Sequence, residues 1–285
     1  MKVKLWGTRG SLATPGPDTI RYGGNTSCVQ VTGVDGTVLV LDAGTGIRQL
    51  GLSLPIDLHR VDILLTHLHM DHLQGLAFFP QMRNPDCEIH IWGPASTTLS
   101  LHNRLTRYIS PPLFPIYLRE MPAPRFLHEV PQGDFDIGEF HIKCDLICHP
   151  DPTVGFRISS PDSSITYLPD HEPALGMGKF PGDKNWTSGY SLAEGADLLI
   201  HDSQYSSEEC AQYVGFGHSA IDQTLAFAKL TDTKHLVPFH HDPSHNDEML
   251  DRLFADSIER ASPTFTVTPG QEGSVFEVGG DQRMK

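Results

Sequence analysis

Short apolar runs, separated by turns rich in glycine, proline, aspartate and asparagine, recur along the chain. Their length and their content of β-branched and aromatic residues are typical of strands. In the first half, such runs predict strands at residues 2–6, 28–32, 37–41, 61–66 and 88–92. In the second half, they predict strands at residues 139–148, 153–159, 164–168, 197–200, 234–238, 264–268 and 275–278. Both halves are therefore expected to be rich in β-structure.

Between and after these strands, apolar residues recur at the spacing of amphipathic helices. This spacing predicts helices at residues 46–52, 73–83, 96–108, 206–213, 220–230 and 246–260. Because each helix has an apolar stripe to bury, two β-rich halves with trailing helices predict an α+β fold, a four-layer αββα sandwich. We expect a single domain over residues 1–285, with halves of about 1–135 and 136–285.

A proline-rich segment at residues 110–131 lies near the end of the first half. Its six prolines exclude a regular helix, because proline lacks the backbone donor and clashes with the preceding turn. Aromatic residues, including Phe114, Tyr117 and Phe126, lie between the prolines. Both a lid over a pocket and a connector packed on the core fit this composition.

The composition narrows the classes of function. Hydrophobic residues make up 39% of the 285 residues and charged residues 20%, which is enough apolar material for a core. There is no apolar run of about 18 residues, and the N-terminus alternates like a strand, so we expect a cytoplasmic protein without membrane contact. The five scattered cysteines fit reduced thiols. A formal net charge of −14 argues against binding to duplex nucleic acid, which requires lysine and arginine.

Candidate metal ligands are concentrated directly after the predicted strand 61–66. Four of them, His67, His69, Asp71 and His72, occur within six residues. Imidazole and carboxylate groups suit zinc, manganese or iron, and a turn lets His67 and His69 face one ion while Asp71 and His72 face a second. A polar surface loop is the alternative, but no packing or turn rule requires three histidines there.

Further motifs extend this picture over the chain: Gly7–Ser11, Gly23–Ser27, Leu41–Gly46, His149–Pro150, Gly155–Ile158, Tyr167–Asp170 and His240–Pro243. With the histidine motif, and in this order, they make the sequence resemble the metallo-β-lactamase superfamily over nearly its whole length. The resemblance is nearest to the phosphodiesterase branch that includes ribonuclease Z and the bacterial cyclic-phosphate phosphodiesterases. It implies the αββα sandwich and a hydrolase with two divalent metal ions, with zinc expected and manganese or iron as alternatives.

The resemblance also implies ligands that spacing leaves open. It makes His149 the third histidine of the first ion, Asp170 the bridge between both ions and His240 the last ligand of the second. From the residues alone, a His-Pro or Leu-Pro-Asp sequence is more often a turn. The neighbours of His240, which include His241 and Asp242, leave the choice of ligand open by spacing.

Several residues are candidates for supporting roles around the ions. Asp42 is expected to stabilise the loop beneath them without acting as a ligand. His241 and Asp242 are expected to orient ligands, as metal-bound histidines usually require. His201 and Asp202 resemble the superfamily's second-half pair of a histidine and an acid, and both a supporting role and a buried structural hydrogen bond are open.

Other residues are candidates for substrate contacts. The resemblance to ribonuclease Z assigns His218 to proton donation or phosphate binding, with an ordinary helix N-terminus as the alternative. Asn25 and Ser27 lie in a glycine-rich turn that could line the metal site, although such turns are common. Arg9 and Arg48 are looser candidates for phosphate contacts.

Two adjacent cations generate hydroxide near neutral pH, so that hydrolysis needs no nucleophilic side chain. Asp71 is expected to accept a hydrogen bond from that hydroxide while acting as a ligand. The sequence shows no inserted Gly-Pro arm and no basic cluster, so the expected substrate is a small anionic phosphodiester such as a cyclic nucleotide. Hydrolysis of a carboxylic ester, lactone or thioester is the first alternative, because one site serves several reactions in the superfamily. A non-catalytic metal-binding or ligand-sensing module is the second, and the resemblance is compatible with a homodimer.

Overall fold

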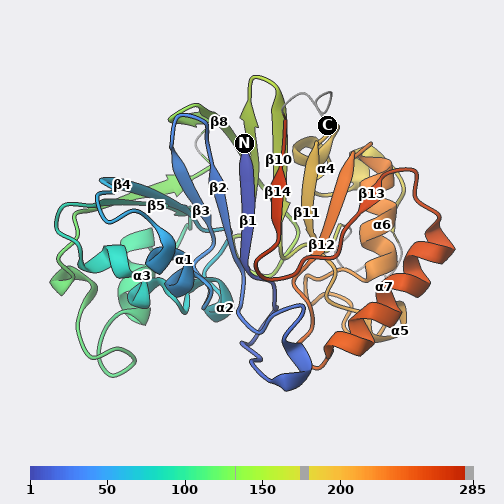
Figure 1. The fold of residues 1–285 in the computed structure, drawn as a ribbon, viewed down its shortest axis with the longest axis horizontal. Helices are drawn as coiled ribbons and strands as arrows, with labels where there is room; N and C mark the ends of the chain where they lie inside the picture. Colours follow the sequence, from blue (N-terminus) through green and yellow to red (C-terminus); the bar gives the residue numbers. More distant parts are fainter. Residues whose placement is uncertain (132, 174–179, 280–285) are drawn as a thin grey trace.

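The computed structural model describes residues 1–131, 133–173 and 180–279, and it contains two seven-stranded sheets packed face to face (Figure 1). The first sheet has the order β14-β1-β2-β3-β4-β5-β6. Its strands are β1 Lys2–Gly7, β2 Cys28–Thr32, β3 Val38–Leu41, β4 Arg60–Leu64, β5 Glu88–Pro94, β6 Arg125–Val130 and β14 Val275–Glu277. The pairs from β3 to β6 are parallel, whereas the pairs that join β14, β1, β2 and β3 are antiparallel.

The second sheet has the order β13-β12-β11-β10-β9-β8-β7. Its strands are β7 Phe135–Ile137, β8 Phe140–Leu146, β9 Val154–Ser160, β10 Ser163–Leu168, β11 Leu198–Asp202, β12 His235–Phe239 and β13 Thr266–Val267. The strands from β10 to β13 are parallel, and those from β7 to β10 are antiparallel. Each predicted strand overlaps an observed one, while β6 and β7 were not predicted.

Helices cover the outer faces of both sheets. In Figure 1, α1 Ile47–Ser53 and α3 Leu101–Tyr108 lie beside the first sheet, and α6 Ile221–Leu230 and α7 Asp247–Ala261 lie beside the second. The shorter helices are α2 Met70–Leu73, α4 Tyr190–Ala193 and α5 Ser207–Cys210. Single 3₁₀ turns occur at η1 Pro17–Thr19, η2 Leu76–Phe78, η3 Pro80–Arg83, η4 Leu118–Glu120 and η5 Lys184–Trp186.

Three apolar clusters separate the four layers. Because side chains two apart on a strand share a face, Ile89 and Ile91 of β5 pack under the helices of the first sheet. By the same rule, Phe140 and Ile142 of β8 join Leu5 of β1 in the cluster between the sheets. A third cluster packs α6 and α7 on the second sheet. The predicted αββα sandwich is therefore confirmed.

Three predicted helices differ from the structure. The helix predicted at 206–213 is shorter, because α5 spans only Ser207–Cys210. The helix predicted at 73–83 is α2, which ends at Leu73, followed by the separate turns η2 and η3. Pro80 begins η3, and its missing N–H group explains why the turns do not join into one helix. The helix predicted at 96–108 begins only at Leu101, because the Ser100 side chain caps it by accepting from the Asn103 N–H group.

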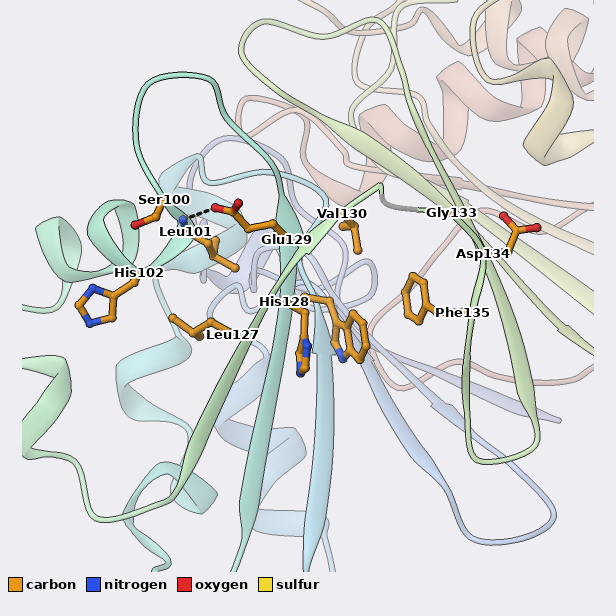
Figure 2. A pocket seen from close by; sticks show the side chains of 11 residues that line it. Ser100, Leu101, His102, Leu127, His128, Glu129, Val130, Gly133, Asp134 and Phe135 are labelled. Atoms are coloured by element: carbon orange, nitrogen blue, oxygen red, sulfur yellow. Dashed lines mark hydrogen bonds between the residues drawn. The ribbon is translucent and has the colours of Figure 1, made fainter.

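The proline-rich segment is a connector that packs on the core. Leu118, Met121 and Ala123 are buried in the cluster of the first sheet, and β6 pairs in parallel with β5. A pocket of about 580 Å³ lies between β6, the start of α3 and β7, as Figure 2 shows. Its lining contains none of the predicted metal ligands, so this pocket is separate from the predicted chemistry.

The predicted ligands follow the carboxyl ends of strands in both sheets. His67 comes after β4, Asp170 after β10 and His240 directly after β12, while His149 comes after β8. Such strand ends are where α/β sheets present functional side chains. Among the described residues, no helix is both long enough and apolar enough to cross a membrane.

Candidate metal centre

The fold brings all seven predicted ligands together in two adjoining groups. His67, His69 and His149 form one group, in which the ligand atoms lie within 4.8 Å of one another. The second group meets the same limit and consists of Asp71, His72, Asp170 and His240. Of these seven side chains, only that of His69 is partly exposed to solvent, and the others are buried.

Asp170 lies between the two groups and faces both with different oxygens. Its Oδ2 atom is 3.7 Å from the Nε2 atoms of both His67 and His149. Its Oδ1 atom is 2.9 Å from His72 Nε2 and 3.2 Å from His240 Nε2. A carboxylate in this position can share one oxygen with each of two neighbouring cations, which is the geometry that the sequence prediction of a bridging Asp170 requires.

The second ring nitrogen of three histidines is held by a hydrogen-bond acceptor. His72 Nδ1 is 2.8 Å from Asp42 Oδ2, His149 Nδ1 is 2.8 Å from the Gly217 carbonyl and His240 Nδ1 is 3.0 Å from Gln204 Oε1. Each acceptor favours a proton on Nδ1, which leaves the Nε2 lone pair free to bind a metal ion. Acceptors on Asp42, Gly217 and Gln204, which lie far from these histidines along the chain, thus orient the rings for coordination.

The imidazole rings in these orientations are suited to bind cations. The Nε2 atoms of His72 and His240 are only 3.3 Å apart, although both rings already donate from Nδ1. Two facing lone pairs repel each other unless a positive charge lies between them. In addition, the buried His67 Nε2 atom has no hydrogen-bond partner, which is costly in a protein interior without a ligand. The donor set therefore fits divalent metal ions.

The electrostatics of the groups also call for positive charge. Burial opposes ionisation of Asp170, but the imidazoles of His240, His72 and His67 hold the pKa of its carboxyl well below the usual range. Burial opposes protonation of His72, yet the Asp170, Asp71 and Asp42 carboxylates raise its pKa well above the usual value. In contrast, burial lowers the pKa of His149 to about 4, so that this ring is neutral and able to act as a ligand.

Asp42 supports the cluster from beneath. It is completely buried and accepts hydrogen bonds from the Thr66 backbone and hydroxyl, from Tyr167 Oη and from His72 Nδ1. Its φ of +58° is in the left-handed region, which Asp tolerates better than most residues. The structure thus places Asp42 as the sequence predicted, behind a ligand rather than among the ligands.

His218 lies beside both groups and is held by Asp202. Its Nδ1 atom is 2.7 Å from Asp202 Oδ2 and 3.9 Å from Asp170 Oδ2. Burial opposes its protonation, but the Asp202 carboxylate and, more weakly, Asp170 and Asp71 raise its pKa to about 9. Asp202 also accepts the backbone N–H groups of Ser219 and Gln204. His218 is therefore a fixed ring at the edge of the cluster, and the Asp202 carboxylate favours its protonated form.

The structure corrects several predicted roles. Ser27 is completely buried, which contradicts direct contact with substrate. Asn25 uses its side chain to donate to Glu272 and to accept from Thr45, so it holds the glycine-rich loop together. Arg9 is also completely buried, and its guanidinium donates to the carbonyls of Gly23, Asp242 and His245, which excludes a phosphate contact in this conformation.

Three further candidates for supporting roles have structural hydrogen bonds. His241 donates from Nε2 to the Gly270 carbonyl, and His201 pairs with the buried His171 at 2.9 Å. Asp242 accepts from Gln204 Nε2 at 3.4 Å and thereby touches the residue that orients His240. His240, rather than His241, faces the cluster, which resolves the ambiguity that spacing left.

Sequence reasoning missed other groups that position the ligands. Gln204 fixes His240, the Gly217 carbonyl fixes His149, and the Ser11 backbone donates to Asp71 Oδ2 at 2.8 Å. Two of these three contacts use backbone atoms, which any residue type supplies. No sequence pattern could therefore have identified these two backbone contacts.

The comparisons with known proteins agree with this geometry. A family model described as "Beta-lactamase superfamily domain" matches residues 37–241, which is more than half of the chain. The chain belongs to the β-lactamase superfamily. Within it, ribonuclease Z of Anoxybacillus flavithermus is 25% identical over 87% of this chain and 90% of its own length. Ribonuclease Z of Thermococcus onnurineus is also 25% identical, over 72% of this chain and 76% of its own length.

Solved structures share the superfamily fold over almost the entire chain. The short form of human tRNase Z has a TM-score of 0.69 and 23% identity, covering 98% of this chain and 100% of that one. A diphosphatase of the PhnP family has a TM-score of 0.67 and 17% identity, covering 98% of both chains. Together with the family match, these findings confirm the predicted resemblance to the phosphodiesterase branch. The protein is a metal-dependent hydrolase with a site for divalent metal ions.

Proposed function

We propose that this superfamily member is a phosphodiesterase with two metal ions that hydrolyses small or cyclic, nucleotide-like phosphodiesters. The position of Asp170 between two groups of histidines carries this proposal. Two divalent ions supply an activated water molecule and polarise the phosphoryl oxygens. This chemistry needs no nucleophilic side chain, so the protein's task is to hold ligands, orient the substrate and deliver protons.

In this proposal, each ion has its own histidines. His67, His69 and His149 hold the first ion, and Asp71, His72 and His240 hold the second, with Asp170 shared. Nitrogen-rich sets with carboxylates suit zinc, and a superfamily neighbour of known structure, PqqB of Methylobacterium extorquens, is described as zinc-bound. That neighbour has a TM-score of 0.69 and 14% identity, so it supports the fold and only suggests the metal.

His218 is the proposed proton donor to the leaving oxygen. The support for this role is its distance of 3.9 Å from Asp170 and its hydrogen bond to Asp202, which keeps the ring charged and fixes Nδ1. The Nε2–H group is then free to face a substrate. A donor positioned in this way typically accelerates hydrolysis by about 10² to 10⁴-fold.

The preference for a small substrate rests on charge. The net charge of −14 repels a long phosphate backbone, and Arg9, one of the two arginines considered for phosphate contacts, is buried in the scaffold. Relatives carry the name ribonuclease Z, so a precursor transfer RNA is a necessary comparison substrate.

The test is a substrate panel with the zinc-loaded and the manganese-loaded protein. It contains bis(p-nitrophenyl) phosphate, cyclic nucleotides, a precursor transfer RNA, lactones and thioesters, with Asp170→Ala as the matched control. We expect hydrolysis of the small phosphodiesters, no cleavage of the RNA and two bound ions per chain by elemental analysis. Turnover of lactones or thioesters alone, or cleavage of the RNA in preference to small diesters, would overturn the proposed substrate class. No turnover of any substrate by fully loaded protein would favour a sensing module.

A further inference from the structure

An exposed aromatic cluster lies in the loop that leads into His218. Tyr213 is 41% exposed and Phe216 is 60% exposed, although both rings would be stabilised by burial. Phe216 is separated from His218 only by Gly217. Isolated exposed apolar residues are common on protein surfaces, so exposure alone assigns no role. The contacts of this loop provide the further evidence.

The loop around Phe216 is anchored to the metal centre on both sides. The Glu172 carboxylate, two residues after Asp170, accepts the backbone N–H groups of Gly215 and Gly217, each at 3.1 Å. The Gly217 carbonyl accepts from His149 Nδ1 at 2.8 Å. Gly217 has a φ of +86°, and a Cβ atom there would lie 2.3 Å from His149 Nδ1. The backbone on either side of Phe216 is therefore fixed relative to two proposed ligands.

A continuous series of ring contacts connects the ligands to Phe216. His240 stacks on His218 with centroids 5.2 Å apart, and His218 meets the edge of Tyr205 at 5.9 Å. Tyr205 stacks on Tyr213 at 4.9 Å, and Tyr213 meets Phe216 at 5.6 Å. Tyr205 is buried and backs the series, whereas Phe216 ends it at the surface. The most exposed ring thus stands at the outer end of a packed series of rings that begins at the proposed proton donor.

We propose that Phe216, supported by Tyr213, is the stacking platform for a planar ring of the substrate, namely the base of a nucleotide phosphodiester. This inference rests on the proposed phosphodiesterase function and adds the specificity determinant. Every base has a π-face, so an aromatic platform binds bases without the positive charge that this acidic chain lacks. Phe216 contacts the base of the substrate and not the phosphoryl group, so it is a specificity residue rather than a catalytic one.

The test compares two substrates that differ only in the base. Cyclic AMP and the corresponding methyl riboside cyclic phosphate, which lacks the base, are assayed with the zinc-loaded wild type and Phe216→Ala. We expect KM for cyclic AMP to rise about 10-fold in the variant, with kcat changed less than about 2-fold and the baseless substrate unaffected. Phe216→Tyr retains a planar ring and should restore the wild-type KM. Phe126→Ala, which removes an exposed phenyl ring from β6, is the matched control and should change neither KM.

An equal change in KM for both substrates in Phe216→Ala, or no change in either KM, would contradict the stacking role of Phe216. If the wild type hydrolyses neither these substrates nor any other phosphodiester of the panel, the proposed function fails, and binding then tests the platform separately. Calorimetric titration of adenosine monophosphate into zinc-loaded wild type and Phe216→Ala should show binding that weakens about 10-fold in the variant. An equal Kd for both proteins would refute the platform independently of turnover.

Discussion

Two pairs of close histidines in this molecule have opposite characters. The Nε2 atoms of His72 and His240 lie 3.3 Å apart in the candidate metal centre. His90 Nδ1 and His128 Nε2 lie 3.1 Å apart and partly buried on the paired strands β5 and β6. In the first pair, Asp42 and Gln204 already hold both Nδ1 atoms, so two lone pairs face each other. This pair needs a positive charge, and the carboxylates of Asp170, Asp71 and Asp42 around His72 favour one.

The second pair is satisfied without one. His90 Nδ1 faces His128 Nε2, so one ring can donate to the other and a single proton satisfies both atoms. His128 stacks on Trp92 with centroids 3.9 Å apart and nearly parallel planes, and Trp92 stacks in turn on Phe135, beside the pocket in Figure 2. Burial lowers the pKa of His128 and favours its neutral form. Two histidines that lie close together therefore do not by themselves indicate a metal site. Buried carboxylates, and acceptors that fix the Nδ1 atoms, do indicate one.

The largest effect is expected from removing the carboxylate of Asp170, which lies between the two ligand groups of the metal centre. Asp170→Ala should lose nearly all hydrolysis and bind fewer than two ions per chain, because Asp170 faces one group with Oδ2 and the other with Oδ1. Elemental analysis after gel filtration and assays of a phosphodiester check both results. Wild-type turnover in this variant would contradict the bridging role.

His218→Ala should retain both ions but lower the rate by about 10² to 10⁴-fold. His218 has a pKa raised to about 9, so the acid form is present below that pH and is lost above it. Bound cations oppose a further positive charge and move this transition below pH 9. The wild-type rate should therefore fall on the alkaline side, and the variant should lack that fall in a pH–rate profile. An unchanged profile would exclude His218 as the proton donor.

Metal ions should also stabilise the fold, because the cluster forms only in the native state. At a free zinc concentration about 1,000 times the Kd, the expected gain in unfolding free energy is about 4 kcal/mol. Thermal unfolding after chelation and after readdition of zinc measures this effect. Asp170→Ala should show a smaller gain, and no zinc-dependent shift in the wild type would count against the site.

Asp42→Asn should weaken metal binding by about 10 to 100-fold, since it removes the charge that orients His72. Tyr167→Phe is the matched control, because it deletes another hydrogen bond to Asp42 but leaves the His72 contact intact. The control should cost about 1 kcal/mol of stability and leave zinc affinity nearly unchanged. Equal losses of affinity in both variants would point to a general loosening of the loop. Zinc titration with a competing chelator distinguishes these outcomes.

The smallest effect is expected at the second histidine pair. The double variant His90→Gln and His128→Gln should keep the same number of ions and the same turnover, with only a small loss of stability from the lost ring contacts. A fall in bound metal would show that this pair is a metal site after all.

Much of the fold and of the ligand set could be predicted from local sequence. Apolar runs marked twelve of the fourteen strands, and β6 was missed because its residues follow prolines that point to a loop. The motif from His67 to His72 predicted a metal site by itself, since several ligand types follow one buried strand. For His149, Asp170 and His240, the resemblance to the superfamily was needed, because a lone histidine or aspartate after a strand is ambiguous.

Residue types and their order along the chain determined the layers of this protein, its strand ends and the chemistry available at them. Only the tertiary structure decided which nitrogen of each histidine is free, that Ser27 and Arg9 are buried, and that Phe216 is fixed beside His218. The reason is physical: periodicity and propensity act over neighbouring residues, whereas orientation and burial at the metal centre depend on contacts between strands far apart in the chain. Several of these contacts come from backbone atoms, which every residue carries and no sequence pattern reveals.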